Sequence, residues 1–261
     1  MKIGIFTALF HDRPIEAALD YIAGAGIESV EFGGGAYPGS RHLDDLGGAR
    51  ALAEEAGKRK KLVELVQSRN LIISAISVHG NPLHPDTNIA QEHHQAFEDA
   101  VLLAEALHGD GIMPQATVNG FSGCPGDSAR AKNPNWVTCA WPDEFRDILD
   151  YQWRVAARYW RAQNRFLKQH GAVFAIEMHP GFLCYNNETL LRLRKVAGDR
   201  IGNLPQLRIR ATDQHRIDSH HFRPPQNRFA RDSIRPQGIH RQDLTAGMHH
   251  DNVPRGATHQ A

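Results

Sequence analysis

Short apolar runs alternate with longer amphipathic segments through the first two hundred residues, and this alternation constrains the fold more than any other feature. The runs expected to form strands are residues 2–7, 27–32, 71–78, 116–121 and 172–178. Successive strand–helix units place their strands in parallel, and five units without a break favour a closed barrel over a doubly wound sheet. The Gly33-Gly34-Gly35 run lacks the GxGxxG spacing of a dinucleotide-binding loop, which disfavours a Rossmann fold.

The segments between these runs have helical periodicity. Asp12 is expected to cap the first helix, with Pro14 in its first turn. Asp86 or Thr87 is expected to cap a third helix, and residues 142–170 predict one long helix that stops at Gly171. The apolar faces of the first and third helices are predicted to contain Ile15, Ala18, Leu19 and Ile22, and Ile89, Phe97, Val101, Ala104 and Leu107, respectively.

The pattern ends at about residue 202, which divides the chain into two predicted parts, 1–202 and 203–261. Residues 203–261 contain no lysine and no glutamate but many arginines, histidines and prolines, and they show no sustained period of 2 or 3.6. Three interpretations remain open: an Arg/His-rich disordered tail, a small folded domain, or a segment translated out of frame. We favour the third, because GC-rich coding sequence read out of frame yields such a composition; resequencing the coding DNA tests it.

The overall composition excludes several classes of function. The net charge is +1 and the charged fraction is 23%, so no global basicity points to nucleic acid or to an anionic membrane surface. No run approaches the roughly 20 apolar residues of a membrane span. The three cysteines form no CxxC pair and leave an odd thiol, which favours a reducing cytoplasm.

Several polar side chains come where a predicted strand ends, and catalytic groups of β/α barrels lie at the carboxyl ends of strands. His79 follows the third strand, Glu177 and His179 end the fifth, and Glu31 and Tyr37 lie at and after the second. A carboxylate such as Glu177 is costly to bury unless it is paired or binds a cation. Glu177 is therefore a candidate metal ligand, with pairing to arginine or backbone amides as the alternative. His79 is either a substrate contact or a structural histidine.

Aromatic residues follow the fourth strand and could stack on the C–H face of a sugar. Trp136 and Trp141 lie in the loop and are candidates for the pocket wall, whereas Trp153, Tyr159 and Trp160 lie at helical positions and are expected to be packing residues. His93 and His94 lie in the middle of a predicted helix among acidic residues. We expect them on a solvated helix face.

Taken together, these motifs resemble the sugar phosphate isomerase/epimerase family, which has the xylose isomerase-like TIM barrel fold. The resemblance covers residues 1 to about 202 and implies an incomplete (β/α)8 TIM barrel of about five to six β/α units, with an irregular C-terminal tail. It rests on Lys2-Ile3-Gly4-Ile5-Phe6-Thr7, Tyr37-Pro38-Gly39, Val78-His79-Gly80-Asn81-Pro82, Phe121-Ser122-Gly123-Cys124-Pro125-Gly126 and Glu177-Met178-His179-Pro180-Gly181.

The resemblance implies a divalent ion, Mn²⁺, Mg²⁺ or Zn²⁺, held by Glu, Asp, His and Glu at the ends of strands five to eight. Glu177 matches the first ligand, but Asn203-Leu204-Pro205-Gln206 stands where the Asp motif is expected, and the tail contains no glutamate. We therefore expect an impaired enzyme. For an intact relative, the implied reaction is a proton transfer next to the carbonyl of a sugar or keto sugar, with Glu177 and His79 catalytic.

The implied substrate contacts are His179, Tyr37, Trp136 and Trp141. No nucleic acid or membrane partner is expected, and a homo-oligomer is left open. Two alternatives compete with this function. One is an inactive truncated barrel or a binding protein; the other is an apurinic endonuclease-like enzyme, which the near-neutral charge disfavours.

Overall fold

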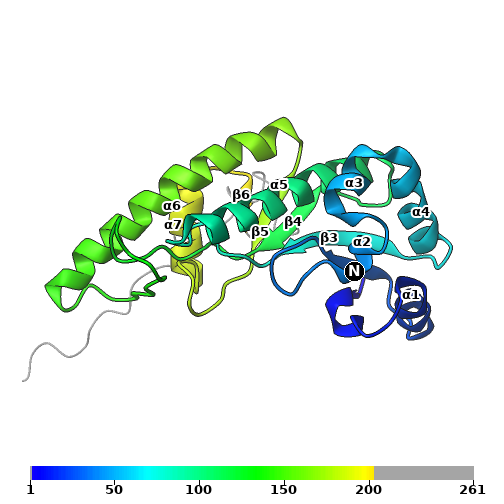
Figure 1. Cartoon of the computed structure of the whole chain (residues 1–261), viewed down its shortest axis with the longest axis horizontal. Helices are drawn as coiled ribbons and strands as arrows, with labels where there is room; N and C mark the ends of the chain where they lie inside the picture. The colour runs from blue at the N-terminus through cyan, green and yellow to red at the C-terminus, as the bar shows by residue number, and fades with distance from the viewer. Residues whose placement is uncertain (1, 203–261) are drawn as a thin grey trace, which may run out of the picture. The chain divides into compact units, whose positions relative to one another are not determined.

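The computed structural model describes residues 2–202, and the predicted tail, 203–261, lies outside the described residues. Within 2–202 a six-stranded parallel sheet has the order β1-β2-β3-β4-β5-β6, so each strand pairs with its neighbours in the sequence. This is the strand order of a β/α barrel, and the predicted α/β class is confirmed (Figure 1). The strands are β1 (Gly4–Phe6), β2 (Ser29–Gly33), β3 (Ile72–Val78), β4 (Thr117–Gly120), β5 (Val173–Ile176) and β6 (Ile201–Gly202).

The helices follow the strands as the periodicity predicts, with one difference. The segment between the second and third strands, expected to form one helix ending near Arg69, forms three. Gly47 and Gly48 adopt positive φ between α2 and α3, and Glu55 is extended between α3 and α4. The helices are α1 (Ile15–Gly24), α2 (Arg41–Asp44), α3 (Gly48–Glu54), α4 (Ala56–Gln67), α5 (Thr87–Gly109), α6 (Asp143–Gln169) and α7 (Asn187–Ala197), with a 3₁₀ turn at Thr7–Phe10.

Two predicted caps have different outcomes. Asp86 caps α5, because its carboxylate accepts hydrogen bonds from the backbone N–H groups of Asn88 and Ile89. The predicted cap at Asp12 is wrong: Pro14 is the N-cap residue of α1, and no side chain accepts a hydrogen bond there. The helix begins at Ile15, and its first backbone hydrogen bond runs from the Ala18 N–H to the Pro14 carbonyl oxygen at 3.0 Å.

The strands and helices share one apolar core, in which α4, α5, α6 and α7 each contact a strand of the sheet. The predicted face of α1 is buried, and the predicted stripe of α5 is buried except for Ile89, which is 36% exposed in the first turn. Trp160 on α6 stacks on Phe174 of β5 with ring centroids 4.9 Å apart, and Phe97 of α5 meets Phe174 edge-on at 5.3 Å. The prediction that Trp153 and Trp160 are packing residues is confirmed by their burial.

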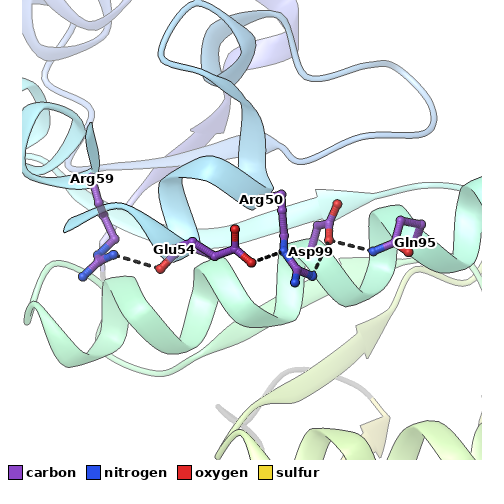
Figure 2. A network of polar contacts seen from close by, with 6 residues as sticks. Arg50, Glu54, Arg59, Gln95 and Asp99 are labelled. Atoms are coloured by element: carbon purple, nitrogen blue, oxygen red, sulfur yellow. Dashed lines mark hydrogen bonds and ion pairs between the residues drawn. The ribbon is translucent and has the colours of Figure 1, made fainter. Parts of the chain in front are cut away.

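A polar network ties α3 to α5 on the surface (Figure 2). Arg50 donates to Glu54 at 2.6 Å and to Asp99 at 3.3 Å, and Gln95 donates to the same Asp99 oxygen at 2.9 Å. Hydrogen bonding to Glu54, and then to Asp99, raises the pKa of Arg50 above its ordinary value. Because Arg50 and Glu54 are exposed to solvent, we expect the network to add little to the free energy of unfolding.

Candidate functional site

The site lies at the carboxyl ends of the middle strands. Val78 pairs with Gly120, and Gly120 pairs with Ile176, so the residues that follow these positions reach the same level of the sheet. Those residues are His79, Phe121 and Glu177. Because side chains alternate along a strand and Ile176 is buried on the outer face, the next residue turns to the inner face.

His79 and Glu177 form a hydrogen-bonded pair across β3 and β5. The His79 Nε2 atom lies 2.8 Å from the Glu177 Oε2 atom. The imidazole is only 7% exposed, whereas the Glu177 side chain is 52% exposed. A buried imidazole therefore orients a carboxylate that remains accessible to a ligand. Oε1 of Glu177 has no hydrogen-bond partner among residues 2–202, so it is open to a proton or a cation.

An aromatic wall flanks this pair. Phe121 contacts the His79 ring at 4.8 Å and stacks on Phe182 at 4.2 Å with an interplanar angle of 26°. His179 contacts Phe121 at 5.0 Å, and its Nδ1 lies 2.6 Å from the Pro180 carbonyl oxygen. Such a wall presents apolar ring surface beside a carboxylate, a combination that suits a polyhydroxylated ligand with an apolar C–H face.

The loop after β2 closes the other side of the site. The His79 backbone N–H donates to the Tyr37 carbonyl oxygen at 3.2 Å, and the Phe6 ring lies 6.0 Å from the His79 ring. Phe6 and Tyr37 line a neighbouring cavity of about 470 Å³, whose lining does not include His79 or Glu177. Only glycine fits at position 33, since a Cβ there would lie 2.2 Å from the carbonyl oxygen of Gly39 in the same loop.

Buried polar side chains fix the loops around the site. The Asn81 side chain exchanges two hydrogen bonds with the Cys124 backbone, at 2.8 and 2.9 Å, which joins the loops after β3 and β4. Ser122 accepts from the backbone N–H of Cys184 at 2.8 Å, and Trp160 donates its indole N–H to the Ser122 carbonyl oxygen at 2.8 Å. Rigid loops of this kind hold site residues in place before a ligand arrives.

The remaining predicted site residues are more peripheral. Tyr37 is 72% exposed and contacts the site through its backbone. Trp136 donates its indole N–H to the Phe182 carbonyl oxygen at 3.0 Å and so supports the aromatic wall from behind. Trp141 is 78% exposed. The roles assigned to these residues, and to Glu177, His79 and His179, stay predictions.

Sequence reasoning missed three aromatic contributors and misjudged two histidines. Phe121 directly follows a strand, as His79 and Glu177 do, and Phe6 is the last residue of β1, so the same rule could have found both. Phe182, in the loop after β5, offers no such signal. His93 and His94 are not simply solvated. His93 accepts from the Asn81 backbone N–H at 2.9 Å, and the His94 ring nitrogen Nδ1 lies 3.1 Å from the Tyr159 hydroxyl oxygen.

Metal ligands are scarce in the described part of the chain. Residues 2–202 contain no group of three His, Cys, Asp or Glu side chains arranged to hold a metal ion. A zinc or similar site takes three or four protein ligands, and His79 and Glu177 are hydrogen-bonded to each other. Residues 2–202 alone therefore do not fit a divalent metal. Nor does any helix in this part combine the length and apolarity needed to cross a membrane.

The sequence profile of a family described as the xylose isomerase-like TIM barrel matches residues 19–205, which is more than half of the chain. The chain belongs to the xylose isomerase-like TIM barrel family. The family resemblance inferred from the strand-end motifs is confirmed. The order of the six parallel strands agrees with this membership.

Individual proteins are similar to the chain in sequence or in fold. The chain is 31% identical over 206 residues to the uncharacterized protein YfiH of Bacillus subtilis strain 168, covering 77% of this chain and 62% of that protein. The structure of the IolI protein with a bound zinc atom has a TM-score of 0.51 at 13% identity, and the match covers 78% of this chain and 62% of that one. A xylose isomerase domain protein from Alicyclobacillus acidocaldarius has a TM-score of 0.50 at 14% identity, also covering 78% and 62%. The chain thus spans about three fifths of the length of these relatives.

Proposed function

We propose that the Glu177–His79 site carries out proton transfer at the carbon next to the carbonyl group of a sugar or keto sugar, as in an isomerase or epimerase. The observation that carries this proposal is the accessible carboxylate of Glu177, held at 2.8 Å by a buried imidazole beside an aromatic wall. A general base needs an available lone pair within reach of the proton it removes. The Oε1 atom of Glu177 offers that lone pair, on a side chain that is 52% exposed.

In this proposal each residue has one task. Glu177 accepts the proton from the carbon and returns it to the same or the neighbouring carbon. His79 is a positioning residue, because it holds Oε2 and so fixes the direction of Oε1. Phe121 and Phe182 stack on the C–H face of the sugar, and His179 closes the end of that wall.

A divalent ion would supply carbonyl polarisation in this chemistry. Glu177 is the donor that residues 2–202 would offer to it. Further ligands would have to come from outside residues 2–202, so we propose that these residues by themselves bind Mn²⁺ weakly and that the present chain turns over slowly. Calorimetry tests this point: micromolar Mn²⁺ affinity that disappears in Glu177→Gln would contradict it.

Hydrogen exchange tests the proposed reaction directly. The purified chain is incubated in D₂O with a panel of ketohexoses and 3-keto glycosides, and loss of the proton next to the carbonyl is followed by NMR. We expect slow, enzyme-dependent exchange for at least one sugar, lowered about 10²–10⁴-fold in Glu177→Gln. Glu188→Gln, in the first turn of α7, is the matched control and should exchange at the wild-type rate. Equal rates in wild type and Glu177→Gln would overturn the proposal.

A further inference from the structure

A single charged stripe runs along α6 and changes sign in the middle of the helix. Its members advance by four, three, four, four, three and four residues, so they follow the helical period and share one face. The first three are acidic and the last four are basic. The stripe consists of Asp143, Asp147, Asp150, Arg154, Arg158, Arg161 and Arg165.

The structure places this stripe at the surface. Asp150 and the four arginines line one groove of about 560 Å³, which Arg192 and Val196 of α7 border on the other side. All seven stripe side chains belong to exposed residues. Figure 1 shows α6 beside α7, with one side of the long helix turned away from the sheet.

The stripe is not neutralised within the described part of the chain. α6 makes an ion pair from Lys168 to Asp199 at 2.9 Å, but no side chain of the stripe has an oppositely charged partner within ion-pair distance among residues 2–202. Like charges four residues apart destabilise a helix, and three such pairs occur here: Asp143 with Asp147, Arg154 with Arg158, and Arg161 with Arg165.

The helix macrodipole explains only the ends of the stripe. Acidic residues at the start of a helix and basic residues at its end are favourable, but the effect falls off within one turn. Asp150 and Arg154 lie near the centre of the 27-residue helix, where the dipole does not select a sign. Asp150 and Arg154 are four residues apart with the acid first, a favourable order within one helix, but this does not account for the runs of like charge on either side of them.

We propose that α6 pairs antiparallel with α6 of a second copy of this chain, through this stripe. When the two helices are related by a two-fold axis at Arg154, Asp143 faces Arg165, Asp147 faces Arg161, and Asp150 faces Arg158. Each pair occurs twice, because a two-fold interface uses the same surface on both copies. The pairs match because the stripe residues before and after Arg154 lie at the same distances from it along the helix. Those before it are acidic and those after it are basic.

The two Arg154 side chains meet at the axis, which is the single like-charge contact of the arrangement. Arg192 adds a cation beside the groove, stacked over the Trp153 ring at 4.2 Å. An exposed ion pair is individually weak, so six of them give an association that depends strongly on ionic strength. The partner is a second copy rather than an unrelated acidic protein, because each copy supplies the complementary charges at matching positions.

Charge reversal and charge exchange test the pairing with the full chain. The association constant is measured by sedimentation over a series of protein and NaCl concentrations. We expect a dimer at low salt that weakens as salt rises. Asp150→Arg and Arg158→Asp should each weaken it at least about ten-fold, because attraction becomes repulsion at two symmetric places. Lys61→Asp, an exposed reversal on α4, is the matched control and should leave it unchanged.

Mixing the two variants gives the decisive result. When the Asp150→Arg chain is mixed with the Arg158→Asp chain, both contacts are again complementary, so a heterodimer should form more tightly than either variant dimerises alone. Arg154→Leu should tighten the wild-type dimer by removing the like-charge contact. Thermal melting shows that each variant is folded. A monomer at all salt concentrations, or a dimer unaffected by either reversal, would overturn the proposal, and neither result bears on proton exchange at Glu177.

Discussion

Two rows of paired residues run across strands β2 to β6, one on each face of the sheet, and their side chains differ in polarity and size. The outer row is entirely apolar and buried, whereas the inner row, one residue further along each strand, consists of small or polar residues. The outer row is Phe32, Ile76, Val118, Phe174 and Ile201. The inner row is Gly33, Ser77, Asn119, Ala175 and Gly202.

The comparison shows that one face of the sheet contributes packing to the core and the other face leads to the candidate site. The outer row contacts the helices and contributes most of the packing energy, because apolar burial is the dominant favourable term in folding. The inner row lies two residues before His79 and Glu177 on their strands, and it places small or polar side chains next to that pair. A substitution in the outer row should therefore lower the free energy of unfolding strongly, and one in the inner row should change the site with less effect on folding.

The largest effect is expected in the outer row. Phe174→Ala removes a ring that stacks on Trp160 at 4.9 Å and meets Phe97 at 5.3 Å, and it leaves a cavity between the sheet and α6. We expect a loss of about 3–5 kcal/mol in the free energy of unfolding. Urea denaturation followed by tryptophan fluorescence measures it. A loss below about 1 kcal/mol would mean that the outer row does not carry the stability.

A smaller effect is expected for a hydrogen-bonded residue of the inner row. The Ser77 hydroxyl is buried and donates to the Glu31 carboxylate on the neighbouring strand. Ser77→Ala should cost about 1–3 kcal/mol, the usual range for a hydrogen bond to a charged group. The double variant with Glu31→Gln checks the cause by the same denaturation method, since the two losses should not add.

Asn119 should be the most tolerant position of the inner row. Its side-chain oxygen is buried without a hydrogen-bond partner among residues 2–202. Asn119→Ala removes that unpaired group, so we expect a change within about 0.5 kcal/mol, or a slight gain. Val118→Ala, one residue away on the outer face, is the control and should cost clearly more. Equal costs at 118 and 119 would break the comparison between the two faces.

The thiols report on how tightly the loops around the site are packed. Burial raises the pKa of Cys124 to about 11 and that of Cys184 to about 12, whereas Cys139 is exposed. Only the thiolate reacts with alkylating agents, so at pH 8 we expect Cys139 to be labelled in the folded chain and the other two only after unfolding. Mass spectrometry after iodoacetamide treatment shows which thiols have reacted. Rapid labelling of Cys124 or Cys184 would show that the loops open.

The same two thiols give the stability a pH dependence. A thiol whose pKa is raised in the folded state binds its proton more tightly there than in the unfolded chain. The stabilising contribution is complete below the ordinary pKa of about 9 and is lost as the pH rises through about 11. The free energy of unfolding should therefore fall in alkaline solution, less steeply in Cys124→Ala.

Much of the fold could be predicted, because buried strands appear in the sequence as short apolar runs and helices with one apolar face appear as a repeat of apolar residues every three or four positions. The boundaries at Gly47 and Asp12 could not, since they depend on backbone conformations and on competition between caps. In the site, the strand-end rule pointed to His79 and Glu177, but their direct hydrogen bond depends on the pairing of β3, β4 and β5. Phe6 ends β1 and was within reach of the same rule, whereas Phe182 comes from the loop after β5, whose path no periodicity encodes.

The central claim is that Glu177 and His79 act as one unit at the inner face. A double-mutant cycle on the deuterium exchange rate tests it most directly, with Glu177→Gln, His79→Gln and the double variant measured on the same sugar. We predict that the double variant exchanges no more slowly than Glu177→Gln alone, because His79 acts only through that carboxylate. Two losses that multiply in the double variant would contradict the account.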